Sequence, residues 1–125
     1  MKVRIYYEDT DAGGIVYHTN YIKYCERARS EHFFTRGIMP GEDNKSGFVV
    51  RKIDADFLGS AVLGDLIEVT TSVIGSKKSS ITLLQEIYKE DKKLFSMEVL
   101  LVYVEAGKPR RIPEKLENIL MDFSK

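Results

Sequence analysis

The feature that most limits the fold of this chain is the alternation of apolar and polar residues in its second half. In the segments 79–88 (SSITLLQEIY) and 94–104 (LFSMEVLLVYV), apolar side chains recur at every second position, and 65–74 (DLIEVTTSVI) is rich in β-branched residues. A period of two residues is typical of β-strands. The connections GSKKSS and KEDKK are short enough for hairpins. We therefore expect these three strands to be antiparallel neighbours.

Two further strands are expected before the hairpins. The segment 48–58 (FVVRKIDADFL) is the nearer one, and 2–8 (KVRIYYE) alternates with Val3, Ile5 and Tyr7 on one face. Between them, the stretch 39–47 (MPGEDNKSG) combines Pro, two Gly, Asn and Ser with charged residues, which is typical of a loop. The sequence therefore predicts about five strands.

Helical periodicity is confined to two segments. The longer covers 19–36 and ends at Gly37, a favourable residue after a helix. The shorter covers 113–123 (PEKLENILMDF) and begins at Pro113, which suits the first turn of a helix. The apolar stripe of the longer helix, at spacings of mostly three and four, consists of Tyr21, Tyr24, Cys25, Ala28, His32 and Thr35.

The order of these elements limits the architecture. A sheet with one apolar face has to be covered, and the only long helix comes early in the chain. The simplest solution is an α+β domain, with an antiparallel sheet of about five strands curled around one long central helix and a short helix at the C-terminus. No repeat, low-complexity tract or linker is visible, so residues 1–125 are expected to form a single domain.

Composition excludes several classes of protein. Lys and Arg total 19, as do Asp and Glu, so the formal net charge is zero and a nucleic-acid binder is not expected. No run of residues approaches the length of a membrane span, and no apolar leader segment is visible near the N-terminus. Cys25 is the only cysteine, so no intrachain disulfide can form. We therefore expect a cytoplasmic protein.

The stretch YYEDTDAGGIVYHTNY joins the first strand to the long helix and concentrates reactive side chains. Asp9 and Asp11 lie where the strand ends, and Gly13 and Gly14 allow a tight turn and close approach of a ligand. The first backbone N–H groups of a helix are unpaired and carry partial positive charge, which suits a carbonyl oxygen that gains negative charge. A neighbouring carboxylate can act as nucleophile or general base.

A purely structural interpretation of the same stretch is also available. Asp and Gly are common in turns for local reasons, and either Thr19 or Asn20 could be the helix N-cap. By the same logic His18 could be structural, and His32 is interpreted as a packing histidine whose polar atoms are satisfied. Cys25 lies in the apolar stripe and is interpreted as a packing residue.

The longer sequence YYEDTDAGGIVYHTNYIKYCERAR favours the functional interpretation. It contains D-x-D-x-x-G, V-x-H-x-N-Y and E-R-A-R in this order. The stretch closely resembles the active-site segment of the 4-hydroxybenzoyl-CoA thioesterase-like branch of the hotdog superfamily. The resemblance is nearest to the bacterial acyl-CoA thioesterases associated with the Tol–Pal system. It continues through ADFLGSAVLGDLIEV, SSITLLQEIY and KPRRIP, and so covers essentially the whole chain.

The resemblance implies a hotdog fold and an acyl-CoA thioesterase that forms free acid and CoA, with active sites between the protomers of a homodimer or homotetramer. Asp11 matches the catalytic carboxylate, as nucleophile or general base. His18 matches an assisting histidine whose backbone N–H polarises the thioester carbonyl beside the Gly13–Gly14 turn. Asp9 is expected to be structural. No metal and no cofactor are implied, and the sequence shows neither ligand spacing for zinc nor a serine elbow.

Substrate contacts can be assigned to two groups of residues. CoA carries phosphates, which Lys, Arg and free backbone N–H groups bind. The resemblance favours Lys77, Lys78 and Ser79 for the nucleotide, and Arg110 and Arg111 are a second basic pair. Solvated turns are an equally good interpretation of both. The tyrosines that could line an acyl pocket along the helix are Tyr7, Tyr17 and Tyr21.

Two other functions are compatible with the sequence. One is a hotdog dehydratase acting on an acyl-carrier-protein thioester, with Glu26 or Glu31 of the helix as its acid. The other is a scaffold that binds acyl-CoA or acyl carrier protein beside envelope or phospholipid-synthesis enzymes. The acyl chain preference, the choice between CoA and carrier protein, and the choice between dimer and tetramer are not specified by the sequence.

Overall fold

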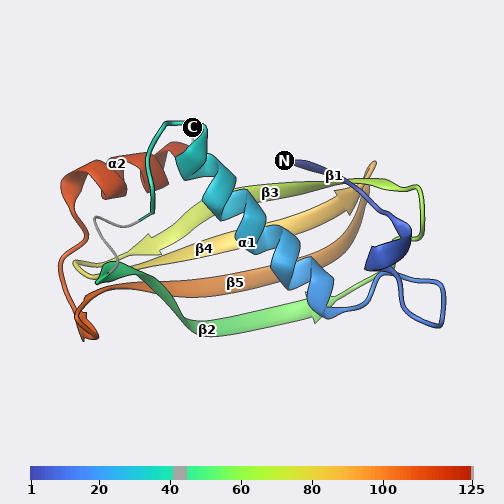
Figure 1. Ribbon diagram of the computed structural model, residues 1–125, viewed down its shortest axis with the longest axis horizontal. Coiled ribbons are helices and arrows are strands. Elements are labelled where there is room, and N and C mark those ends of the chain that lie inside the picture. The colour runs from blue at the N-terminus through green and yellow to red at the C-terminus, as the bar shows by residue number, and fades with distance from the viewer. Residues whose placement is uncertain (41–44, 125) are drawn as a thin grey trace.

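The computed structural model describes residues 1–40 and 45–124 and contains an antiparallel sheet that curves around one helix (Figure 1). The strand order is β1-β3-β4-β5-β2, and the two-residue strand β6 (Lys108–Pro109) pairs with the end of β5. The predicted sheet of about five strands is therefore confirmed. Its strands are β1 (Lys2–Arg4), β2 (Ser46–Phe57), β3 (Leu66–Ser76), β4 (Ser80–Lys89) and β5 (Lys92–Glu105).

Helix α1 (Thr19–Phe34) crosses the concave face of the sheet (Figure 1). It buries Tyr21, Tyr24, Cys25 and Ala28 of the predicted stripe, whereas His32 is half-buried and Thr35, the C-cap, is exposed. Alternate residues of β4 are buried beneath the helix, as the period of two requires: Ile81, Leu83, Gln85 and Ile87. Apolar burial of this kind contributes about 25 cal/mol per Å² and is the main force that holds the helix on the sheet. The arrangement is the hotdog fold that the resemblance implies.

One polar group lies in this core and connects the helix to the sheet. The Gln85 side chain is fully buried; its amide donates to the Cys25 carbonyl oxygen at 2.9 Å and to the Thr71 hydroxyl at 3.1 Å. Its own oxygen accepts from the Arg29 guanidinium at 2.8 Å. Because unpaired buried polar groups are costly, these bonds favour a single position of α1 over β3 and β4.

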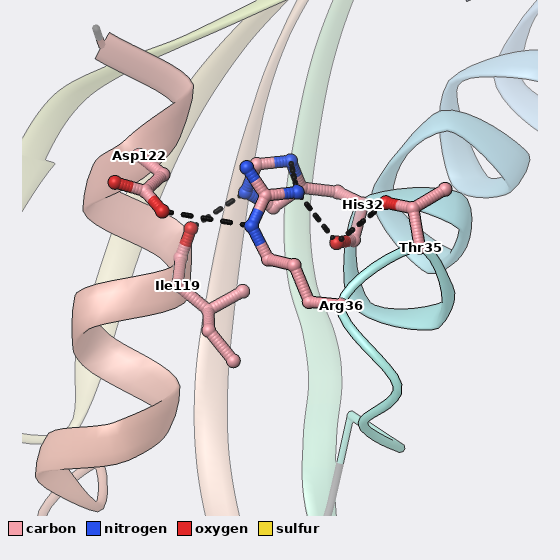
Figure 2. Close-up of polar contacts among 5 residues, drawn as sticks. All are labelled: His32, Thr35, Arg36, Ile119 and Asp122. Atoms are coloured by element: carbon pink, nitrogen blue, oxygen red, sulfur yellow. Dashed lines mark hydrogen bonds and ion pairs between the residues drawn. The ribbon is translucent and has the colours of Figure 1, made fainter.

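The short helix α2 (Glu114–Met121) and the 3-10 turn η2 (Asp122–Ser124) contact the C-terminal end of α1 (Figure 1). Figure 2 shows that His32 is central to this contact. Its Nε2 lies 2.6 Å from the Ile119 carbonyl oxygen, and its Nδ1 lies 3.1 Å from the Arg36 guanidinium. The His32 ring also stacks on Phe123, with ring centroids 3.6 Å apart. The interpretation of His32 as a satisfied packing histidine is confirmed.

The expected first strand is wrong beyond residue 4. After β1 the chain forms a 3-10 turn, η1 (Tyr7–Asp9), and the Tyr7 side chain is 80% exposed instead of sharing the buried face of Ile5. The Asp9 carboxylate accepts the Tyr6 backbone N–H at 2.8 Å. This local bond competes with strand pairing, as Asp side chains commonly do.

Two further boundaries differ from the sequence-based expectation. The N-cap of α1 is His18, not Thr19 or Asn20, and it makes no side-chain capping bond. Asn20 instead donates its side-chain amide to the Asp9 carbonyl oxygen at 2.9 Å. Strand β2 begins at Ser46, inside the expected loop 39–47, of which residues 41–44 lie outside the described part.

Candidate active site

The carboxylate of Asp11 is presented by a small hairpin between η1 and α1. The Asp11 N–H donates to the Ile15 carbonyl oxygen at 2.9 Å, and the Gly14 N–H donates to the Asp11 carbonyl oxygen at 3.0 Å. Gly14 has a φ of 82°, which favours glycine at this position. A Cβ at Gly13 would lie 3.2 Å from Asp11 Oδ1, so the absence of a side chain there leaves room for the carboxylate.

The hairpin is anchored at both ends to the rest of the fold. The Asp9 carbonyl oxygen accepts the Tyr17 N–H at 3.0 Å in addition to the Asn20 side chain. On the other side, the Val16 N–H donates to the Ala61 carbonyl oxygen at 3.0 Å, just ahead of β3. These bonds hold the Asp11 hairpin against the first turn of α1.

The Asp11 carboxylate itself is exposed and lightly engaged. Its Oδ1 accepts one hydrogen bond, from the Gly13 N–H at 2.8 Å. None of the ion pairs found in residues 1–40 and 45–124 involves Asp11. A carboxylate with free lone pairs at the surface can accept a proton from water or attack a carbonyl carbon directly.

The start of α1 supplies the complementary group. In the part of the chain that the structure describes, no acceptor bonds the backbone N–H of His18 or Thr19. Unpaired N–H groups at a helix N-terminus bind negatively charged oxygen, and the helix dipole adds to the attraction. Asp11 and the His18 N–H therefore lie within one segment of eight residues, joined by the bonds described above.

Aromatic rings surround His18. The Tyr17 ring lies 4.8 Å from the His18 ring, and the Phe57 ring meets it edge-on at 5.7 Å between centroids. Tyr17 and Phe57 are each 48% exposed, whereas Tyr21 is buried and its hydroxyl oxygen accepts the Ala61 N–H at 2.9 Å. Sequence reasoning did not find Phe57, because it reaches His18 only through the pairing of β2 with β5.

The three tyrosines expected at an acyl pocket are thus placed differently from one another. Tyr17 lies beside His18 at the surface, and Tyr21 is part of the core behind it. Burial raises the pKa of Tyr21, which keeps the hydroxyl protonated. Tyr7 points into solvent from η1 and makes no ring contact with the other two among the described residues.

Cys25 is unsuited to nucleophilic chemistry. The thiol is fully buried in the core beneath α1. Burial raises the pKa of Cys25 to about 12, whereas reactive cysteines have a lowered pKa and some exposure. Its interpretation as a packing residue is therefore confirmed.

The two basic segments expected to bind phosphate come together at the far end of the sheet. The Ile112 N–H donates to the Lys78 carbonyl oxygen at 2.9 Å, which places Arg110 and Arg111 beside the β3–β4 hairpin. The side chains of Lys77, Lys78, Arg110 and Arg111 are exposed, while Ser79 is half-buried. We refer to these four cations as the basic surface.

Within one chain the basic surface and the Asp11 hairpin are at opposite ends of β3 (Figure 1). The strand has 11 residues and so spans about 35 Å at 3.3 Å per residue. A single chain therefore does not bring Lys77, Lys78 or Ser79 to Asp11 and His18.

No group of three or more His, Cys, Asp or Glu side chains in residues 1–40 and 45–124 has the arrangement of a metal site. Over the same residues, no helix has both the length and the apolar character to cross a bilayer.

Comparison with known proteins places this geometry in a family. A family model described as the thioesterase superfamily matches residues 13–96, which begin two residues after Asp11 and include all of α1 and strands β2 to β4. The chain belongs to the thioesterase superfamily. The resemblance found in the sequence is thereby confirmed.

Individual relatives agree with this assignment. Acyl-CoA thioesterase YbgC of Helicobacter pylori is 51% identical over 88 residues, which are 70% of this chain but only 65% of that protein. Acyl-CoA thioester hydrolase YbgC of Escherichia coli O157:H7 is 38% identical over 121 residues, covering 91% of this chain and 89% of the relative. The crystal structure of a probable thioesterase from Bartonella henselae superimposes with a TM-score of 0.83 at 29% identity, over 90% of this chain and 97% of the other.

Proposed function

We propose that this protein is an acyl-CoA thioesterase that hydrolyses an acyl-CoA thioester to a carboxylic acid and CoA. The observation that carries the proposal is that one anchored segment presents both an exposed carboxylate, which forms no ion pair within the described residues, and free helix N-terminal N–H groups. The names of the YbgC relatives support acyl-CoA as the substrate class.

Each step of the reaction has a group to perform it. The His18 N–H, with the dipole of α1, polarises the thioester carbonyl and stabilises the oxyanion that forms when the carbon is attacked. In the general-base route, Asp11 removes a proton from water as the water oxygen attacks. The tetrahedral intermediate then collapses, the C–S bond breaks, and the CoA thiolate leaves and takes up the proton that Asp11 had removed from water, which restores the carboxylate.

In the nucleophilic route, Asp11 attacks the carbonyl carbon itself and expels the CoA thiolate. The product is a mixed anhydride, which water then hydrolyses to the free acid and the restored carboxylate. After single turnover in oxygen-18 water, heavy oxygen found in the Asp11 peptide by mass spectrometry would establish the anhydride route, with water attacking the aspartyl carbonyl. Only the anhydride route can leave the heavy oxygen in the side chain.

The decisive test is the release of free thiol from a panel of acyl-CoAs by wild type and Asp11→Asn. Asparagine keeps the shape of the side chain and removes its charge, so we expect kcat/KM to fall by on the order of a hundredfold or more. Asp91→Asn, in the exposed β4–β5 turn, is the matched control and should retain activity. Wild-type activity that Asp11→Asn leaves unchanged would refute the role of Asp11.

Binding of acyl-CoA without its hydrolysis would support the scaffold alternative instead of the thioesterase. If wild type binds acyl-CoA, or an acyl carrier protein, but hydrolyses no member of the panel, the scaffold alternative is correct. Calorimetric titration with a non-hydrolysable acyl-CoA analogue reports this outcome independently of the thiol assay.

The basic surface suits the phosphates of CoA. Four exposed cations lie on two adjacent segments, and none of them takes part in an ion pair within the described residues. Because the basic surface lies at the opposite end of β3 from Asp11, the CoA nucleotide bound there would belong to a thioester held by another protomer. We therefore place the complete site between two chains.

A further inference from the structure

The space behind His18 is closed by packed aromatic rings. Tyr21 and Phe95 stack with centroids 5.5 Å apart and an interplanar angle of 17°, and both are buried. Phe57 packs on Phe95 at 5.1 Å and on Tyr21 at 6.4 Å. These distances are those of rings in direct contact. An acyl group whose carbonyl is held at the start of α1 cannot extend into the core of the same chain.

Phe57 is the member of this cluster that faces outward. It is the last residue of β2 and is held by its pairing with Phe95 of β5. Its ring is 48% exposed, whereas Phe95 is fully buried and Tyr21 is 2% exposed. On its inner side, then, Phe57 contacts the core, and its edge contacts the His18 ring.

Further apolar side chains are exposed next to Phe57 in the sequence and at the Asp11 hairpin. Leu58 follows it directly, and Ile15 and Val62 pair as an isolated bridge at the base of the Asp11 hairpin. Leu58, Ile15 and Val62 are 56%, 40% and 43% exposed. Among the described ring contacts, Phe57 is the side chain outside the Asp11 segment that lies against His18, beside the start of α1.

We propose that Phe57 determines the acyl specificity of the site, acting as the wall that ends the acyl pocket and restricting efficient substrates to short, compact acyl groups. This inference rests on the proposed thioesterase function, because it assumes that the thioester carbonyl binds at the start of α1. Phe57 lies outside the Asp11 segment, yet under this proposal it determines which acyl groups react there.

The inference is tested by chain-length profiles of Phe57→Ala. We would measure kcat/KM for butyryl-, hexanoyl-, octanoyl- and decanoyl-CoA. In wild type, kcat/KM should stop rising once the chain reaches the ring. In Phe57→Ala it should continue to rise by about fourfold per added methylene group. The ratio of decanoyl- to butyryl-CoA activity should then increase by on the order of tenfold or more.

Phe34→Ala is the matched control. Phe34 is 46% exposed, close to the value for Phe57, and lies at the opposite end of α1 from His18. Its removal should leave the chain-length ratio unchanged. Phe57→Leu, which keeps an apolar side chain of intermediate size, should give an intermediate ratio and supplies the test if Phe57→Ala does not fold.

The outcomes separate this inference from the proposed function. If Phe57→Ala loses activity uniformly at all chain lengths, or leaves the chain-length ratio unchanged, Phe57 serves packing or association alone. Either result would overturn the inference, although wild type would remain a thioesterase. If wild type hydrolyses no acyl-CoA, the proposed function fails instead, and the specificity assignment fails with it.

Discussion

At the scale of single residues, His18 offers a direct test of what a backbone group does. Its φ of −54° is close to the value that proline imposes, so proline fits this N-cap position and removes the N–H. We expect His18→Ala, which removes only the imidazole, to cost less than about tenfold in kcat. His18→Pro should cost on the order of a hundredfold, as the loss of an oxyanion donor does.

Circular dichroism and the melting temperature of both variants control for folding. Because both variants lack the imidazole, the ratio of their kcat values isolates the contribution of the backbone N–H. Equal activity of the two variants would exclude the backbone N–H as the donor. A loss in His18→Ala as large as that in His18→Pro would assign the role to the imidazole instead.

At the scale of secondary structure elements, the contact between α1 and α2 is expected to respond to pH. Arg36 can only donate and the Ile119 carbonyl can only accept, so the network in Figure 2 assigns His32 as the neutral tautomer protonated on Nε2. Burial lowers the pKa of His32, and the nearby Arg36 lowers it further, against the opposing effects of the Ile119 carbonyl and of Asp122. Protonation would place a charged ring beside the Arg36 guanidinium.

The sign of the effect follows from the direction of this shift. The folded state binds the proton less readily than the unfolded chain, so the stabilisation is complete above the ordinary histidine pKa of about 6.5. It is lost as the pH falls from there through the lower pKa of the folded state. We expect the melting temperature to fall between pH 8 and pH 5.5.

His32→Gln keeps an N–H donor for Ile119 and does not titrate, so its melting temperature should depend less on pH over this range. The only other histidine, His18, is exposed at the start of α1, and His18→Gln should behave as wild type. If His18→Gln flattened the profile and His32→Gln did not, the assignment to the α1–α2 contact would be wrong.

The same scale shows what could be predicted from the sequence. The hairpins β3–β4 and β4–β5 and the helix α1 were predictable because their periodicity is local and survives in the fold. The end of β1 and the cap of α1 were not, because both depend on Asp9, whose side chain and carbonyl bind groups on either side of it. Such competing local bonds have no periodic signal.

In the candidate site, the residues of the sequence motif could be predicted, whereas residues that reach the site only through the tertiary structure could not. Asp11 and His18 could be named because they lie in one contiguous motif. Phe57 could not, since its place beside His18 depends on the register of β2 against β5. The adjacency of Lys78 and the segment after β6 likewise arises from a backbone bond between elements distant in sequence.

At the scale of the whole molecule, one edge of the sheet is incomplete. Strand β2 ends the strand order, and within the described residues it pairs only with β5. Val50 and Ile53 oppose the buried residues Leu101 and Val99, so they share the face of the core. Yet they are 48% and 37% exposed, because α1 does not extend over this edge. A second copy joined along β2 would cover them and continue the sheet, which is how exposed edges are commonly protected.

We therefore expect a dimer in solution and predict that Val50→Lys yields monomers, measured by light scattering coupled to size-exclusion chromatography. Ile74→Lys is the control: Ile74 is also 48% exposed but lies on β3, on the opposite side of the sheet from β2. If the basic surface of one chain holds the CoA bound at Asp11 of the other, monomers should also lose the advantage of CoA thioesters over N-acetylcysteamine thioesters, which lack the nucleotide. Monomeric wild type would exclude the shared site, and a monomeric Val50→Lys that retains this advantage would place nucleotide binding within one chain.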